Sequence, residues 1–177
     1  MKAKVQVVIE SEHGQLIVHD VATITRTTFS TGTLGLSLSE GKNLLQHLQA
    51  SIVNQQVSEW LRDTRDCPIC GSPRSLKGHH SLVCQTVFGK VQLDSPRLRH
   101  CPCEKADHRS FSPLSKRLSE RTTPELAYLE AKWASLMSYG LTVDILSEVL
   151  PLEGQINTTS IRRQVERVAD RVEQAMG

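Results

Sequence analysis

The sequence has few aromatic residues and no long apolar run. Only three Phe, two Trp and two Tyr occur among the 177 residues, and the hydrophobic fraction is an ordinary 38%. The absence of a long apolar run excludes a membrane-spanning helix. The N-terminal basic residues precede a short apolar run that continues as a strand pattern, which excludes a secretory signal peptide. The sequence therefore predicts a soluble, cytoplasmic protein without a membrane partner.

The chain also lacks a strong overall charge, but its charge is unevenly distributed. The formal net charge is +2. Residues 71–121 contain ten Lys or Arg and four Asp or Glu, whereas the net charge is −1 before this segment and −3 after it. A local positive field attracts polyanions by releasing their counterions. We therefore expect double-stranded DNA as a partner of the middle segment, and a merely solvated charged face is the alternative.

Three segments are predicted along the chain, at 1–66, 67–110 and 111–177. The first contains two β-prone runs, at 4–9 and 15–25, joined by a polar turn. A long helix then begins near Ser37, which has capping-box spacing with Glu40, and an apolar stripe continues to about residue 62. This stripe predicts core packing, with contact to a second protein chain as the alternative.

Two short cysteine clusters, C-P-I-C-G and C-P-C, are the most informative feature of the sequence. Between them lie two β-prone runs around a turn at Phe88-Gly89-Lys90. Two cysteine pairs at the open end of a hairpin can present four thiolates to one tetrahedral Zn²⁺. Four protein ligands leave no position for a reactive water, so this pattern predicts a structural zinc ribbon. The predicted ligands are Cys67, Cys70, Cys101 and Cys103.

Other roles for the cysteines are less consistent with the sequence. Reduced thiols packed in a core are one alternative, whereas disulfides conflict with five cysteines and no secretory signal. Cys84 falls inside a strand pattern and is expected to be a small buried hydrophobe. His79, His80 and His100 lie near the clusters and could substitute as ligands, but we expect them to be surface or core residues.

The C-terminal segment predicts three helices after an irregular polar connector. The first opens at Thr123 with Pro124 in its first turn and stops at Tyr139-Gly140. The second extends from Thr142 to Leu150, and the third begins near Asn157 or Thr158. This order resembles a helix-turn-helix, in which the last helix enters the major groove by its N-terminal end. The alternative is a plain helical bundle with Arg–Glu pairs such as Arg162 and Glu166.

The predicted DNA contacts combine the basic middle with the start of the last helix. Long basic side chains can reach phosphates or guanine edges, and hydroxyl groups at a helix N-terminus can donate to phosphate. The predicted contacts are Arg74, Lys77, Arg97, Arg99, Arg109, Lys116, Arg117, Arg121, Thr158, Thr159, Ser160, Arg162, Arg163 and Arg167. Together the segments predict an α+β protein with an N-terminal strand pair and long helix, a central zinc-ribbon-like β-hairpin and a C-terminal helix-turn-helix-like three-helix segment.

The order of motifs resembles one transposase family. The run P-E-L-A-Y-L-E-A-K-W-A-S-L-M-S-Y-G-L-T-V-D-I-L-S-E-V-L-P and the following I-N-T-T-S-I-R-R resemble the N-terminal half of insertion-sequence transposases of the ISKra group. C-P-I-C-G, K-G-H-H, T-V-F-G-K-V, S-P-R-L and C-P-C resemble the zinc-binding segment of the same proteins. The resemblance implies a DNA-binding region that recognises the ends of its element. A free-standing zinc-ribbon and helix-turn-helix transcriptional regulator is the alternative.

The resemblance also implies where the chemistry lies. In that family an RNase H-like domain with an Asp-Asp-Glu triad and two Mg²⁺ ions follows the DNA-binding region. We expect that domain to be absent from this chain, which ends at Gly177 shortly after the third helix. The chain is then inactive alone, and Mg²⁺ is needed only if a catalytic domain is supplied. Besides DNA, the implied partners are a second copy of the chain or a catalytic transposase chain.

Overall fold

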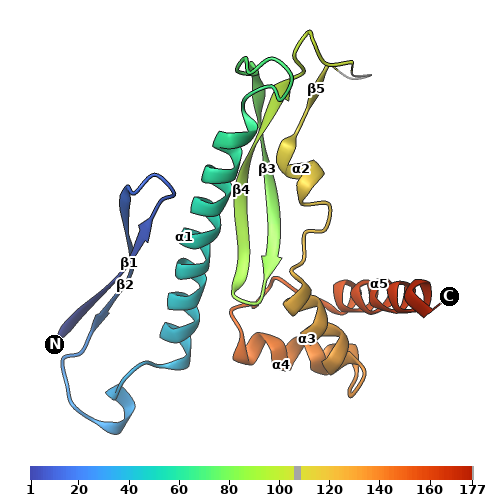
Figure 1. The fold of residues 1–177 in the computed structure, drawn as a ribbon. Helices are drawn as coiled ribbons and strands as arrows, with labels where there is room; N and C mark the ends of the chain where they lie inside the picture. Colours follow the sequence, from blue (N-terminus) through green and yellow to red (C-terminus); the bar gives the residue numbers. More distant parts are fainter. Residues whose placement is uncertain (106–108, 177) are drawn as a thin grey trace.

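The structure, a computed structural model, describes residues 1–105 and 109–176. It is an α+β fold with an N-terminal hairpin, a long helix, a central sheet and several short helices (Figure 1). The predicted fold class is therefore confirmed. In Figure 1 the long helix stands beside the central hairpin, and the three C-terminal helices gather at one end of that hairpin.

The N-terminal part contains a two-stranded antiparallel sheet and a long helix. Its elements are β1 (Lys2–Glu10), β2 (Leu16–Thr25), a 3₁₀ turn (Thr31–Thr33) and α1 (Leu38–Thr64). The capping box predicted at the start of α1 is confirmed. The Ser37 hydroxyl accepts from the Glu40 N–H at 3.2 Å, and the Glu40 carboxylate accepts from the Ser37 N–H at 2.9 Å. Arg26, just after β2, forms an ion pair with Glu40 and so ties the hairpin to the helix.

The central sheet is a long hairpin with a short third strand. Its strands are β3 (Leu76–Thr86), β4 (Gly89–Arg99) and β5 (Ser110–Phe111), all antiparallel. Thr86 pairs with Gly89, so Val87 and Phe88 form the turn and the predicted turn is displaced by one residue. Gly89 has a φ of +103°, and a Cβ there would lie 3.1 Å from the Gln46 side-chain nitrogen of α1. The turn therefore requires glycine for its backbone and for its close contact with α1.

One face of this hairpin is apolar and covered, and the other is polar. Strand alternation places Leu82, Val91 and Leu93 on the same face, where all three are buried. Side chains of α1 and Leu114 of α2 (Pro113–Arg117) pack against them.

The polar connector predicted to be irregular contains regular structure. Its described part, 104–105 and 109–121, includes β5 and α2. Residues 106–108 lie outside the described part of the chain.

The C-terminal module has three helices: α3 (Pro124–Ala134), α4 (Tyr139–Val149) and α5 (Thr158–Met176). The prediction that the first helix reaches Tyr139-Gly140 is wrong. The apolar period continues through Leu136 and Met137, but the helix ends at Ala134. Ser138 then caps a new helix, because its hydroxyl accepts from the Leu141 N–H.

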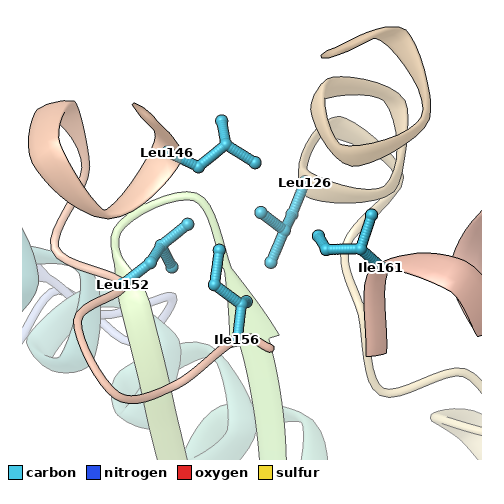
Figure 2. Close-up of a cluster of buried hydrophobic side chains, with 5 residues drawn as sticks. All are labelled: Leu126, Leu146, Leu152, Ile156 and Ile161. Atoms are coloured by element: carbon cyan, nitrogen blue, oxygen red, sulfur yellow. The ribbon is translucent and has the colours of Figure 1, made fainter. Parts of the chain in front are cut away.

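The helical module has its own apolar core at the turn end of the central hairpin. Five buried aliphatic side chains, contributed by α3, α4, the α4–α5 connection and α5, meet there: Leu126, Leu146, Leu152, Ile156 and Ile161 (Figure 2). Val87 of the hairpin turn packs against this cluster. The segment before α3 also pairs with β3, since the Gln85 N–H donates to the Arg121 carbonyl at 2.6 Å and the Thr123 N–H donates to the Gln85 carbonyl at 2.9 Å. The hairpin thus joins the helical core to the rest of the protein.

Candidate metal centre and basic cleft

The hairpin brings the two cysteine clusters together at its open end. Cys67 and Cys70 follow α1, and Cys101 and Cys103 follow β4. The sulfur separations are 3.4 Å for Cys67–Cys103, 3.4 Å for Cys70–Cys101 and 3.5 Å for Cys70–Cys103. All four sulfurs lie within 4.8 Å of one another. A tetrahedral zinc site with Zn–S bonds of about 2.3 Å separates its sulfurs by about 3.8 Å. The cluster can therefore hold a metal ion such as zinc.

The first cysteine pair sits on a tight backbone turn that favours thiolate. Gly71 adopts a φ of +70°, and its N–H donates to the Cys67 carbonyl at 2.9 Å. Hydrogen bonds from the Ser72 hydroxyl and the Ser72 N–H lower the pKa of Cys70 to about 6. This is the geometry expected of a metal-binding knuckle.

The second cysteine pair shows why a cation fits this cluster. The pKa of Cys103 is raised because its sulfur hydrogen-bonds to the neighbouring sulfurs, chiefly that of Cys101. A thiolate at Cys103 would lie next to these sulfurs and would be repelled by any negative charge on them. Four sulfurs at this spacing cannot all be thiolates without a positive charge between them. A divalent cation supplies that charge and deprotonates coordinating thiols.

The other candidate ligands lie outside the cluster, each with another contact. Cys84 is half-buried and packs against the core of the sheet, and burial raises the pKa of its thiol. The remaining candidates are histidines with oxygen partners: His79 with Asp94 at 2.7 Å, His80 with Ser115 at 3.1 Å and His100 with Glu104 at 3.2 Å. The four predicted cysteines alone form the candidate metal centre of the described residues.

Arg74 is a buried structural residue, which corrects its prediction as a phosphate contact. Its guanidinium forms an ion pair with Glu104 and donates to the carbonyls of Thr64 at 3.1 Å and Asp66 at 3.0 Å. Glu104 in turn accepts from the Cys101 N–H at 2.8 Å. Arg74 holds the pKa of Glu104 down at about 2, with help from that N–H. The pair thus links the end of α1 to the second cysteine knuckle, and its donors are unavailable to DNA.

The other basic residues predicted from the middle of the chain are exposed. Those on β3 and β4 or near β5 lie toward the cysteine end of the hairpin, and two more lie on α2. Arg121 follows α2 and lies nearer the helical module. The exposed set is Lys77, Arg97, Arg99, Arg109, Lys116, Arg117 and Arg121.

Only some of the DNA contacts predicted at the start of α5 have side chains that are available to a ligand. Thr158 and Thr159 are exposed, as a groove contact requires. The Ser160 hydroxyl, however, donates to the Asn157 carbonyl at 2.7 Å, so its single hydrogen is used inside the chain. Arg162 is exposed and forms an i,i+4 ion pair with Glu166 at 3.4 Å.

A cleft of about 570 Å³ gathers basic residues from distant parts of the sequence. The segment 119–122, one side of β3, and helices α3 and α5 form its walls. The predicted contacts Arg121, Arg163 and Arg167 all line it, together with Arg171, which the sequence analysis missed. Arg171 pairs with Glu120 at 2.5 Å. The i, i+4, i+8 spacing along α5 was the available signal for Arg171.

Two polar side chains of the cleft are almost completely buried. Glu130 on α3 is 2% exposed and Gln164 on α5 is 4% exposed. Burial raises the pKa of Glu130 to about 7, although the charge of Arg167 opposes this shift. Neither residue was predicted from the sequence as a contact.

No protein-family model, curated protein or solved structure matches the chain. Its function is therefore inferred from the chemistry of the cysteine cluster and the basic cleft. Within residues 1–105 and 109–176, no helix is long and apolar enough to cross a bilayer.

Proposed function

We propose that this chain is the DNA-binding portion of an insertion-sequence transposase of the ISKra group and that it recognises element-end DNA. The observation that carries the proposal is the convergence of Arg121, Arg163 and Arg167 on one cleft. These residues were selected from the sequence as DNA contacts, and they come from segments about forty residues apart. Guanidinium groups that converge in this way suit DNA, because Arg binds both phosphates and guanine edges with paired donors.

The cysteine cluster has a structural role in this proposal. Zn²⁺ held by Cys67, Cys70, Cys101 and Cys103 joins the end of α1 to the end of β4. With four protein ligands the ion fixes geometry and leaves no open position for chemistry. It thereby holds the basic strand residues, such as Arg97 and Arg99, in a fixed relation to the rest of the hairpin. DNA recognition, rather than strand cleavage, is the role assigned to the chain.

The helical module supplies sequence preference. The first turns of α5 enter the major groove with Thr158, Thr159, Arg162 and Arg163, and the other exposed basic residues contact phosphates. The connection 150–157 is longer than the usual three or four residues of a helix-turn-helix. The module is therefore a helix-turn-helix-like reader with an extended turn.

The test is a comparison of two arginine variants on selected DNA. A preferred duplex is first selected from a random library at fixed salt. Arg163→Ala is expected to relax preference at one or two base pairs, by about 1–3 kcal/mol if its base contact is bidentate. Arg117→Ala is expected to weaken all duplexes alike, because phosphates carry no sequence information directly.

Two outcomes of this experiment would change the assignment. If both variants weaken selected and random duplexes equally, α5 is a structural helix and the helix-turn-helix interpretation is wrong. A selected sequence that matches the ends of a mobile element supports the transposase. A match to a promoter instead would identify the chain as a transcriptional regulator.

A further inference from the structure

The N-terminal hairpin is a small sheet with an open edge. In Figure 1 it lies beside α1, on the side away from the central sheet. Within residues 1–105 and 109–176, β1 and β2 form ladders only with each other. Helix α1 packs mainly against β2, which leaves the outer edge of β1 open. An isolated two-stranded sheet is marginally stable, and an open edge presents backbone donors and acceptors to another strand.

The even-numbered residues of β1 direct their backbone N–H and carbonyl groups to this open edge. Odd-numbered positions face β2 at both ends of the strand: the Arg26 N–H donates to the Met1 carbonyl at 2.8 Å, and the Ser11 N–H donates to the Gln15 carbonyl at 2.9 Å. Alternate residues of an antiparallel strand face opposite neighbours. The edge therefore belongs to five residues with exposed side chains: Lys2, Lys4, Gln6, Val8 and Glu10.

The two edges of the hairpin differ in their suitability for further pairing. Strand β2 contains a bulge at Val21, because Val5 pairs with Ala22 and the next residue of β1 pairs with Asp20. Bulges bend a strand and blunt a sheet edge. Strand β1 has neither an extra residue nor a proline along its nine residues. The β1 edge is therefore the one that can receive another strand, and its side chains determine which strand fits.

The charges along β1 are complementary to those of a second copy of the same strand. When two copies pair antiparallel with Gln6 opposite Gln6, Lys2 of each copy lies opposite Glu10 of the other. Neither Lys2 nor Glu10 forms an ion pair among the described residues of one chain. Opposite charges across a strand pair stabilise it, and like charges destabilise it. By two-fold symmetry this register pairs both charges twice.

The other side chains of β1 agree with this register. Val8 is 59% exposed and lies opposite Lys4 of the other copy, whose aliphatic stem can cover it. A shift of the register toward the turn would instead place Glu10 opposite Lys4. The Lys4 ammonium is already paired with the Asp20 carboxylate at 2.8 Å, and Lys2 would then lie beyond the end of the paired strand.

We propose that the outer edge of β1 binds the same edge of a second copy of this chain, antiparallel and with Gln6 at the two-fold axis, to form a four-stranded sheet in the order β2-β1-β1-β2. Each pair of edge residues exchanges two backbone hydrogen bonds, so the full strand forms about ten. The proposal does not rest on the proposed DNA-binding function. It adds a two-fold axis, which is the symmetry of an inverted-repeat DNA site.

The first test measures the association of the full, metal-loaded chain in the absence of DNA. A single strand edge is a small interface, so we expect a reversible monomer–dimer equilibrium with a Kd on the order of 10 μM. Sedimentation equilibrium at protein concentrations from about 1 to 500 μM measures this constant. A chain that stays monomeric over this range would overturn the proposal.

Charge reversal tests the register. Glu10→Lys and Lys2→Glu each place like charges opposite one another twice in a dimer, so each should weaken dimerisation about tenfold or more. An equimolar mixture of the two variants restores both opposite-charge pairs and should form heterodimers with an affinity close to that of the wild type. Glu12→Lys makes the same change of charge at an exposed position in the turn and should leave dimerisation unchanged. A mixture that fails to associate would overturn the register.

Hydrogen exchange locates the interface on the strand edge. The N–H groups of Gln6 and Val8 should be protected at concentrations where the dimer forms and unprotected in monomeric Glu10→Lys. The N–H groups of Val7 and Ile9 face β2 and should be protected in both proteins, which shows that the hairpin itself stays folded. A dimer in which Gln6 and Val8 stay unprotected would overturn the assignment to the β1 edge. Because no DNA is present, these outcomes are independent of the proposed function.

Discussion

The two ends of the central hairpin are stabilised in different ways. At the turn end, five buried aliphatic side chains form the core of the helical module. At the open end, only Cys67 and Arg74 are buried among residues 66–75 and 100–105. Two short loops cannot bury enough apolar surface to hold their own shape. The cysteine cluster, which can hold a metal ion, and the Arg74–Glu104 pair therefore take the place of a hydrophobic core at the cysteine end.

The largest effect on stability should follow from substitution of a cysteine of the four-cysteine cluster. We predict one Zn²⁺ per chain, bound with Zn–S distances of about 2.3 Å, and loss of the metal in Cys103→Ser. Structural zinc contributes on the order of 10 kcal/mol to the folding of small zinc modules, so both knuckles should lose hydrogen-exchange protection. Cys84→Ser is the matched control and should retain the metal. Elemental analysis that finds no metal in protein purified without chelators would contradict this prediction.

A smaller but still large effect should follow at the helical end. Leu126 is fully buried among the five aliphatic side chains, and Leu126→Ala should lower the free energy of unfolding of this module by about 2–5 kcal/mol. Urea unfolding monitored by tryptophan fluorescence can report the loss, because Trp133 packs against this core. The metal content should stay at one ion per chain. Simultaneous loss of metal would mean that the two ends are not independently stabilised.

The smallest effect on stability is expected at the start of α1, away from both ends of the central hairpin. A hydrogen-bonded ion pair with Arg26 lowers the pKa of Glu40 from 4.5 to about 2. Because the folded-state pKa is below the unfolded one, the stabilisation is present above about pH 4.5 and is lost as the pH falls through about 2. The protection of the first turn of α1, measured as its hydrogen-exchange rate relative to the intrinsic rate at each pH, should therefore fall over this pH range. In Glu40→Gln the first turn should exchange faster already at neutral pH, and a wild-type-like profile would contradict the role of the pair.

The sequence was most informative where spacing alone determines geometry. The β1–β2 strands, the Ser37–Glu40 capping box and the four-cysteine cluster follow from alternation, local hydrogen bonding and paired ligands, and each is found in the structure. Such features depend on neighbouring residues or on a constraint that a metal imposes. They can therefore be predicted without knowledge of the tertiary packing.

The sequence was least informative where tertiary contacts decide. Arg74 is indistinguishable in sequence from the exposed arginines. Its structural role comes from its ion pair with Glu104, which lies in a distant segment of the sequence. The break after Ala134 was hidden by an unbroken apolar period, because the Ser138 cap competes with continuation of the helix. Glu130 likewise gave no signal, since its burial depends on α5 packing against α3.

The most direct test of the central claim is the salt dependence of duplex binding. If about six of the exposed basic residues contact phosphates, affinity should fall about a thousandfold between 50 and 200 mM salt. Arg121→Ala and Arg167→Ala should each lower the slope of log affinity against log salt by about one, whereas Lys132→Ala should not. A flat salt response in the wild type, or equal slopes for all three variants, would contradict DNA binding through the basic cleft.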